Sequence, residues 1–237
     1  LAQLEQEGIE LVVVDECHHS MAESYLSILS VLEAKLLGFT ATVERLDGKD
    51  ITELFGEPVY EKSILYMILS KYLVDIRSYA VRSKSTSLDG VSTTGGDYQT
   101  ARLTSAIDRP DRNEVIVDAY KEYADGLSTI AFAVTVEHAE HLAKAFRDAG
   151  ISAAALSAET PATQREDLLS KYQAGEIKVL VNVMLFAEGF DAPLTSCIIM
   201  ARPTKSLSLF KQCLGRGLRL YTCLLYTSPS PRDRQKS

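Results

Sequence analysis

The chain has 237 residues, of which 46% are hydrophobic and 24% charged, and its formal net charge at pH 7 is −7. This composition is typical of globular domains and argues against an intrinsically disordered chain, while the length fits one large domain or two of ordinary size. The negative charge argues against broad nonspecific attraction to nucleic acid but leaves a local basic groove open.

The four cysteines lie far apart and show no CxxC spacing: Cys17, Cys197, Cys213 and Cys223. This pattern is typical of unpaired thiols in a reducing compartment rather than of a disulfide framework or a zinc knuckle. The sequence shows no signal-peptide pattern and no apolar run that approaches the length of a membrane span. We therefore expect a cytoplasmic protein without a membrane partner.

The two ends of the chain look unusual. Residues 1–10 read as the tail of a helix that runs directly into a strand, so we expect the N-terminal part of the first domain to be missing. Residues 223–237 abandon the periodicity of the chain, and 223–233 match a translated transposon-type sequencing adaptor without interruption. We expect this tail to be non-native and exclude it from functional reasoning.

Between the ends, short apolar runs alternate with stretches of helical spacing. The expected strands are 9–15, 34–41, 74–81, 128–134, 151–157, 177–183 and 195–201. The clearest helical stretches are 136–150, which ends in a Gly suited to a left-handed cap, and 160–175, with Pro161 in its first turn. Continuous apolar strands that alternate with helices predict an α/β fold whose parallel sheet is covered on both faces.

One stretch of the sequence, 83–110, is rich in Ser, Thr and Gly and only weakly periodic. Such composition is typical of a connection between domains. We expect a first domain over 1–82, a linker over 83–110 and a second domain over 111–222.

The run "DECHHS" at 15–20 follows an apolar strand and brings together the residue types that carry chemistry. A zinc site fails on geometry, because adjacent residues on a strand or turn point apart. A hydrolase triad lacks a GxSxG elbow, and a purely structural Asp-Glu pair stays open. Carboxylates at the carboxyl end of a buried parallel strand lie where such sheets bind ligands, which favours a site for nucleotide phosphates.

In that interpretation Asp15 holds Mg²⁺ through water, because Mg²⁺ prefers hard oxygen ligands and keeps several waters. Glu16 orients and polarises the water that attacks the γ-phosphate of ATP. His18 is either a residue that couples the site to the second domain or a structural histidine of the turn. We interpret His19 as structural.

Three further stretches follow in a fixed order: "GFTATVERLDGKD" at 38–50, "VLVNVMLFAEGFDAP" at 179–193 and "QCLGRGLR" at 212–219. Together with "VVDECHH" at 13–19 they resemble motifs II, III, V and VI of the superfamily 2 helicases. The motif sequences are more similar to those of the DEAD/DEAH-like branch, which includes type III restriction subunits and double-strand DNA translocases, than to those of the RNA DEAD-box proteins. The resemblance implies two RecA-like (P-loop NTPase) domains, the first incomplete, with ATP and Mg²⁺ between them.

The same resemblance implies roles for the matching residues. Thr40, Thr42 and Glu188, in addition to His18, would couple hydrolysis to domain movement. Gly189, Asp191 and Gly215, in addition to Asp15, would lie near the nucleotide. Catalytic residues of the second domain would be Gln212, Arg216 and Arg219, since an arginine fork neutralises charge that develops on the γ-phosphoryl oxygens.

Ser157 and Thr160 follow an expected strand and either contact the nucleic-acid backbone or cap a helix. No GxxxxGK[ST] phosphate loop occurs in the 237 residues, so we expect this chain alone to be inactive. The expected function is that of part of an ATP-dependent helicase or translocase, with DNA favoured over RNA. The alternatives are a noncatalytic RecA-like module that binds nucleic acid or protein, and the motor subunit of a restriction enzyme.

Overall fold

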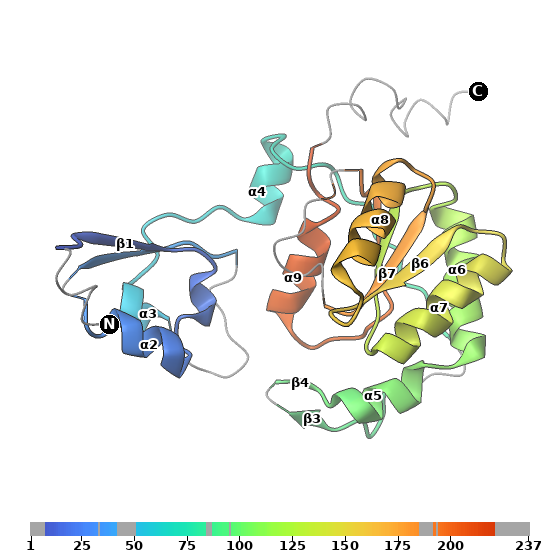
Figure 1. The fold of residues 1–237 in the computed structure, drawn as a ribbon, viewed down its shortest axis with the longest axis horizontal. Helices are drawn as coiled ribbons and strands as arrows, with labels where there is room; N and C mark the ends of the chain where they lie inside the picture. Colours follow the sequence, from blue (N-terminus) through green and yellow to red (C-terminus); the bar gives the residue numbers. More distant parts are fainter. Residues whose placement is uncertain are drawn as a thin grey trace.

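The computed structural model describes residues 8–32, 34–41, 51–83, 87–94, 96–184, 192 and 194–220. In chain order its elements are β1 (Leu11–Val14), η1 (Cys17–His19), α2 (Glu23–Leu29), β2 (Lys35–Gly38), α3 (Thr52–Phe55), α4 (Ile64–Leu69), β3 (Thr93–Thr94), β4 (Asp97–Tyr98), α5 (Thr100–Ile107), α6 (Pro110–Tyr123), β5 (Thr129–Phe132), α7 (Val136–Asp148), β6 (Ala153–Leu156), α8 (Ala162–Gln173), β7 (Val179–Asn182), β8 (Cys197–Met200) and α9 (Leu207–Gly215). The expected α/β class is confirmed, and the described residues form a smaller and a larger unit joined through α4 (Figure 1).

The larger unit is built on a four-stranded sheet in the order β6-β7-β5-β8, and every pairing in it is parallel. The central strands β5 and β7 are buried at all positions, which is why their sequences read as unbroken apolar runs. The four expected strands between 128 and 201 are thereby confirmed.

Helices cover both faces of this sheet (Figure 1). On one face, Leu142 and Phe146 of α7 and Tyr120 of α6 pack against Ala131 and Val181 of the strands. On the other face, Tyr172 of α8 and Leu209 and Cys213 of α9 pack against Ile130 and Leu180. Alternate residues of one strand serve opposite faces, so α9 is tied directly to the central strand β5.

The ends of α7 follow the rules of helix capping. The Thr135 hydroxyl accepts a hydrogen bond from the His138 amide at 3.2 Å, which satisfies one of the free N–H groups of the first turn. After the last turn, Gly150 adopts φ 81°, as the sequence predicted for a left-handed cap.

The smaller unit contains β1 and β2, a parallel pair in which Leu11 lies opposite Lys35 and Val14 opposite Gly38. Helix α2 lies between the two strands in the chain. The core of the smaller unit consists of Val14, Cys17, Leu29 and Ile51. This unit confirms the expected strands at 9–15 and 34–41.

The prediction of a strand at 74–81 is wrong. This segment has no regular secondary structure, and its first amide, that of Val74, donates instead to the Leu218 carbonyl beyond α9 at 3.1 Å. The side chain of Tyr79 stacks on Tyr123 of α6 with the ring centroids 4.3 Å apart. The segment therefore contacts the larger unit through Val74 and Tyr79 without a β-ladder, and its apolar side chains Ile76, Tyr79 and Val81 remain 41%, 52% and 49% exposed.

The segment expected as a linker contains regular structure. The strands β3 and β4 form an antiparallel hairpin, and α5 follows it at once. Leu103 and Ile107 of α5 are fully buried against Val134, which follows β5. Within the described ranges, none of the helices has the length and apolar character that crossing a bilayer requires.

Candidate functional site

The site begins where β1 ends, at the carboxyl edge of the parallel pair. Phe39 donates its amide to the Val14 carbonyl at 2.8 Å, and Cys17 donates its amide to the Phe39 carbonyl at 2.9 Å. These bonds continue the pairing of the two strands beyond their ends. Asp15 and Glu16 are thereby fixed beside the segment that follows β2.

Glu16 adopts a left-handed backbone conformation, φ 47° and ψ 47°. For a residue with a Cβ atom this conformation costs roughly 1–2 kcal/mol, and such strain is concentrated at functional sites. The Glu16 amide donates to Asp15 Oδ1 at 2.9 Å, which helps to hold the turn. The turn presents the Asp15 carboxylate to solvent and leaves Glu16 half-buried.

Cys17 packs beneath this turn and is 2% exposed. Burial raises the pKa of the Cys17 thiol, and the charges of Glu16 and Asp15 raise it further. A buried thiol of raised pKa is a weak nucleophile, so Cys17 contributes packing beneath the turn. Among the described residues, no group of three or more His, Cys, Asp and Glu side chains could hold a metal.

Gly38 at the end of β2 permits this packing. A Cβ atom added there would lie 2.7 Å from Cys17 Sγ and 3.0 Å from Phe55 Cδ1. Gly38 was not among the expected site residues, although a glycine inside a strand is a known signal of close approach by another chain segment.

His18 is 8% exposed and has neighbours on three segments of the chain. Its Nδ1 atom lies 3.0 Å from Thr40 Oγ1 and 3.4 Å from Glu16 Oε2. Its Nε2 atom lies 3.4 Å from Gln212 Nε2 in α9. Because an amide nitrogen only donates, this contact makes His18 Nε2 the acceptor and leaves the Nδ1 proton for Thr40 or Glu16.

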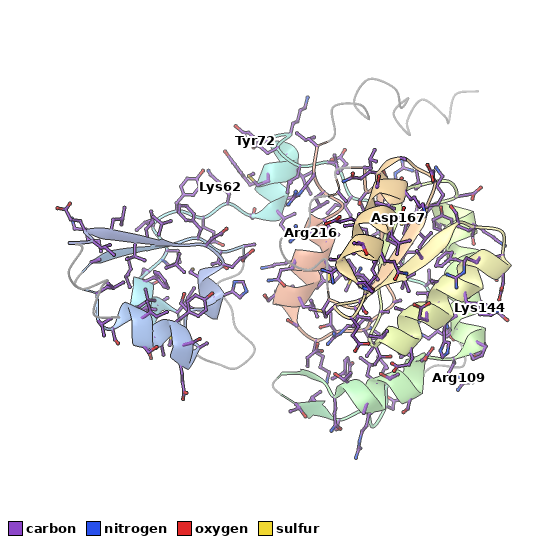
Figure 2. All side chains as sticks on the ribbon, in the orientation of Figure 1. Lys62, Tyr72, Arg109, Lys144, Asp167 and Arg216 are labelled. Atoms are coloured by element: carbon purple, nitrogen blue, oxygen red, sulfur yellow. The ribbon has the colours of Figure 1, made fainter. Side chains whose placement is uncertain are left out.

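Three further expected residues, Gly215, Arg216 and Arg219, lie at or just beyond the end of α9. Gly215 is its last residue, and Arg216 caps the helix, with its amide 3.3 Å from the Cys213 carbonyl (Figure 2). Burial raises the pKa of the Cys213 thiol to about 12, an effect that the charges of Arg202 and Arg216 oppose. Arg219 is exposed just beyond the helix.

The structure thus brings together four of the expected residues: Glu16, His18, Thr40 and Gln212. Four others lie outside the described residues: Thr42, Glu188, Gly189 and Asp191. The side chain of His19 is likewise outside what the structure describes.

Ser157 and Thr160 lie apart from this group, in the turn between β6 and α8. The Thr160 hydroxyl accepts from the Ser157 amide at 3.0 Å, and the Ser157 hydroxyl accepts from the Glu159 amide at 3.2 Å. Pro161, rather than either hydroxyl residue, occupies the N-cap of α8, and no side chain caps that helix. Both hydroxyls therefore stabilise the turn that precedes the helix.

The residues at the end of β1 fit a hydrated Mg²⁺ ion. Asp15 offers a hard carboxylate oxygen at an exposed position, and Glu16 lies beside it. Mg²⁺ at nucleotide sites keeps several waters and needs only one or two carboxylates in addition to phosphate oxygens. A single exposed aspartate at this edge is therefore a sufficient protein contribution.

Comparisons with known proteins found similar sequences for both units. The sequence model of the family "Helicase conserved C-terminal domain" matches residues 111–221, and that of "Type III restriction enzyme, res subunit" matches 1–45. The chain is 37% identical over 231 residues to IRC3 of Saccharomyces cerevisiae, a protein named for ATP-dependent helicase activity; the match covers 93% of this chain and 33% of IRC3.

A second relative is the protein named DNA 3′-5′ translocase XPB2 of Sulfurisphaera tokodaii, 27% identical over 88% of this chain and 55% of the relative. Among solved structures, a fragment described as an HsdR subunit of a type I restriction enzyme from Vibrio vulnificus superposes with a TM-score of 0.69. It is 28% identical, and the match covers 90% of this chain and 41% of that one. The chain thus spans about one third to one half of the length of these relatives. The two family models and these relatives together support a fragment of a superfamily 2 helicase.

Proposed function

We propose that this chain is the portion of an ATP-dependent DNA helicase or translocase in which ATP hydrolysis is coupled to the relative position of two RecA-like units. The observation that supports this most directly is the position of His18. It lies within 3.4 Å of Gln212 on one side and 3.0 Å of Thr40 on the other. One imidazole therefore connects motif II with motif III and with motif VI.

In this proposal the smaller unit supplies the groups that act on water and metal. Asp15 holds hydrated Mg²⁺, which would neutralise phosphate charge when bound. The Glu16 carboxylate accepts a proton from the attacking water. The left-handed turn at Glu16 and its contact with His18 fix the direction of that carboxylate.

The larger unit supplies positive charge. Arg216 and Arg219 lie at the end of α9, where a planar guanidinium can bind phosphoryl oxygens with two parallel hydrogen bonds. Gly215 leaves space beside this helix end, since a Cβ atom added there meets nothing within 4 Å. Glu188, Gly189 and Asp191 of motif V and Thr42 of motif III would complete the set.

Because the acid and the arginines belong to different units, hydrolysis requires the units to close. Hydrolysis then depends on domain position, which is the property that a motor needs. The chain contains no phosphate loop in its 237 residues, so we propose that it does not hydrolyse ATP by itself.

DNA is favoured over RNA because the named activities of the relatives concern DNA. XPB2 is named a DNA translocase, and the HsdR fragment and the matched res subunit belong to restriction enzymes. The same two similarities favour a second candidate, the motor subunit of a restriction enzyme. Translocation on duplex DNA without strand separation would support that candidate, whereas release of a labelled strand would support a helicase.

The test uses a complete protein that carries the upstream phosphate loop. Glu16→Gln should retain ATP binding and DNA binding while ATP turnover falls by about 10²–10⁴-fold, the range that general base catalysis contributes. Turnover near the wild-type value would exclude Glu16 as the base. If RNA stimulates ATP turnover of the wild-type protein and DNA does not, the preference for DNA is overturned.

A further inference from the structure

Asp97 of the hairpin β3–β4 binds the segment that leads from β8 into α9. Its Oδ2 atom accepts a hydrogen bond from the Thr204 hydroxyl at 2.8 Å, and its Oδ1 atom accepts one from the Lys205 amide at 2.8 Å. The Arg202 guanidinium lies 3.6 Å from Oδ2, and the Asp97 side chain is only 13% exposed. One carboxylate therefore holds three positions, 202, 204 and 205, of a segment that is distant in sequence.

Two further contacts tie the same segment to residues that precede β5. The Arg112 guanidinium of α6 donates to the Ala201 carbonyl at 2.8 Å. The Lys205 ammonium lies 4.9 Å from the ring centroid of Tyr98, the neighbour of Asp97 in β4. The start of the segment is thus anchored on α6 and its end on the hairpin β3–β4.

A continuous series of hydrogen bonds leads from Asp97 into α9. The Thr204 hydroxyl, which donates to Asp97, accepts from the Ser206 amide at 3.0 Å. The Ser206 hydroxyl in turn accepts from the Leu209 amide at 3.0 Å and so caps the helix. Because a helix of nine residues moves as a unit, whatever fixes its first turn also fixes Gln212.

We propose that Asp97 is a positioning residue for motif VI: it fixes the start of α9 so that Gln212 and Arg216 meet the end of β1. This inference rests on the proposed ATPase function. Asp97 lies outside the helicase motifs, and its effect passes through Thr204 and Ser206. The physical reason is that a carboxylate with several donors makes strong, charge-assisted bonds, and its loss leaves the mostly buried Arg202 without this counter-charge.

The first test uses the 237-residue chain and needs no nucleotide. In Asp97→Ala, the amides of Lys205 and Leu209 should exchange hydrogen for deuterium about tenfold faster, the loss expected for a hydrogen bond to a charged group. Amides of the β5 core, such as that of Ala131, should keep their wild-type protection. Unchanged exchange at Leu209 would overturn the proposed connection between Asp97 and the helix.

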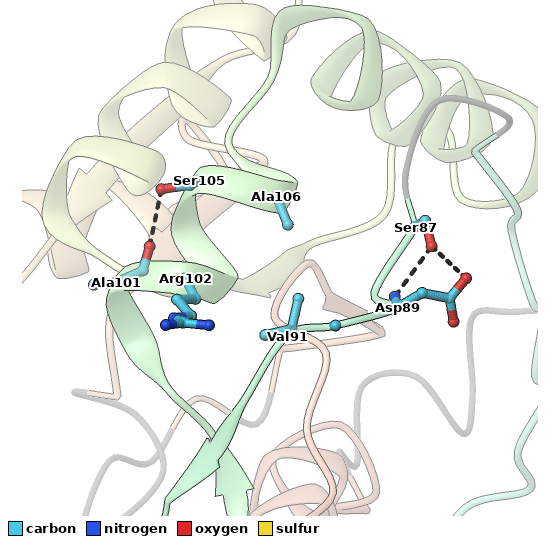
Figure 3. A pocket seen from close by; sticks show the side chains of 8 residues that line it. Ser87, Asp89, Val91, Ala101, Arg102, Ser105 and Ala106 are labelled. Atoms are coloured by element: carbon cyan, nitrogen blue, oxygen red, sulfur yellow. Dashed lines mark hydrogen bonds between the residues drawn. The ribbon is translucent and has the colours of Figure 1, made fainter.

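The matched control is Asp89→Asn, in the same polar segment. Asp89 accepts a hydrogen bond from the Ser87 hydroxyl at 2.7 Å, and its own amide donates back to that hydroxyl at 3.0 Å, within one turn (Figure 3). This variant should leave the exchange of Lys205 and Leu209 unchanged. A loss of protection equal to that of Asp97→Ala would show a general loosening of the segment and would contradict a specific anchor.

The second test measures ATP turnover in a complete protein. Asp97→Asn and Thr204→Val should each lower kcat by at least about tenfold, because misplacement of catalytic groups by about 1 Å costs up to 10²-fold. The KM for ATP should stay within about threefold, since the arginines act mainly on the transition state. The double variant should be no slower than the worse single variant, because both residues act on one path.

The outcomes separate the two proposals. A wild-type protein without DNA-stimulated turnover would overturn the proposed function, whereas the exchange experiment would still decide the anchoring role of Asp97. Wild-type turnover in Asp97→Asn, or strictly additive losses in the double variant, would overturn the positioning role and leave the proposed function intact.

Discussion

Gly38 is the position at which a single methyl group should disturb the candidate site without touching any group that acts on substrate. A Cβ atom at residue 38 would lie 2.7 Å from Cys17 Sγ, whereas ordinary contacts begin at 3.4 Å. Phe55 at 3.0 Å blocks a shift in another direction. Gly38→Ala must therefore displace Cys17, and with it the strained turn at Glu16.

Overpacking of this kind typically costs about 1–3 kcal/mol of stability. Displacement of the Glu16 carboxylate by a few tenths of an ångström up to about 1 Å should lower kcat by about 10- to 100-fold. We expect Gly38→Ala in a complete protein to show this loss of ATP turnover with little change in the KM for ATP. Steady-state ATPase assays at saturating DNA measure both quantities.

Removal of the atom that causes the clash should restore activity. Cys17→Ala deletes the sulfur but leaves its Cβ atom at 3.0 Å from the added methyl, so rescue by the double variant should be partial. The single variant Cys17→Ala controls for loss of the buried thiol. A kcat for Gly38→Ala within twofold of wild type, or additive losses in the double variant, would refute the reasoning.

Three further predictions concern the rest of the chain. Arg219→Ala should lower DNA-stimulated ATP turnover by about 10³–10⁵-fold with DNA affinity nearly unchanged, and Arg219→Lys should rescue little; weaker DNA binding with normal saturated turnover would assign Arg219 to nucleic-acid phosphate instead. Burial lowers the pKa of His138 to about 4; the charge of Asp108 opposes this shift, and those of Arg112 and His141 add to it. Between pH 6.5 and 4 the unfolded chain therefore binds more protons than the folded chain. The free energy of unfolding should fall as the pH drops through this range. In urea unfolding of the larger unit, His138→Gln should lose less stability over this pH window than the wild type, and an equal loss in both would contradict the assignment. Limited proteolysis should cleave residues 8–83 before 111–220, because β1 and β2 form only a two-stranded pair with exposed apolar side chains; early cleavage within β5 to β8 would contradict this.

The parts of the fold that sequence could predict are those in which local pattern and burial coincide. The run at 128–134 reads as a buried strand because β5 is covered by helices on both faces, so both sets of alternate residues are apolar. The segment 74–81 has a similar pattern but lacks a ladder, since the Val74 amide bonds to Leu218 across the chain. Apolar content alone therefore predicts neither burial nor a strand, because Ile76 and Val81 are exposed and only a partner strand provides a ladder.

The candidate site shows the same division. The approach of Cys17 to Gly38 had a local signal, a glycine at the end of a strand, which the sequence analysis did not use. The contact of His18 with Gln212 joins residues 194 positions apart, and no periodicity predicts it. The polar composition of 83–110 predicted a connection and concealed Asp97, because a buried acceptor and a solvated one have the same letter in the sequence.

Two anchors act on α9 at different points, and their effects should differ in kind. Asp97 and Ser206 fix the first turn of the helix, so a change there moves Gln212 and Arg216 together. His18 contacts the helix at Gln212, so a change there removes this contact, while the bonds of Asp97 and Ser206 to the first turn remain. Loss of the Asp97 anchor should therefore impair every function of motif VI. Loss of His18 should leave the arginines of motif VI in position and remove only their dependence on the state of motif II. In this proposal the hairpin places the arginines, and the histidine communicates between the units.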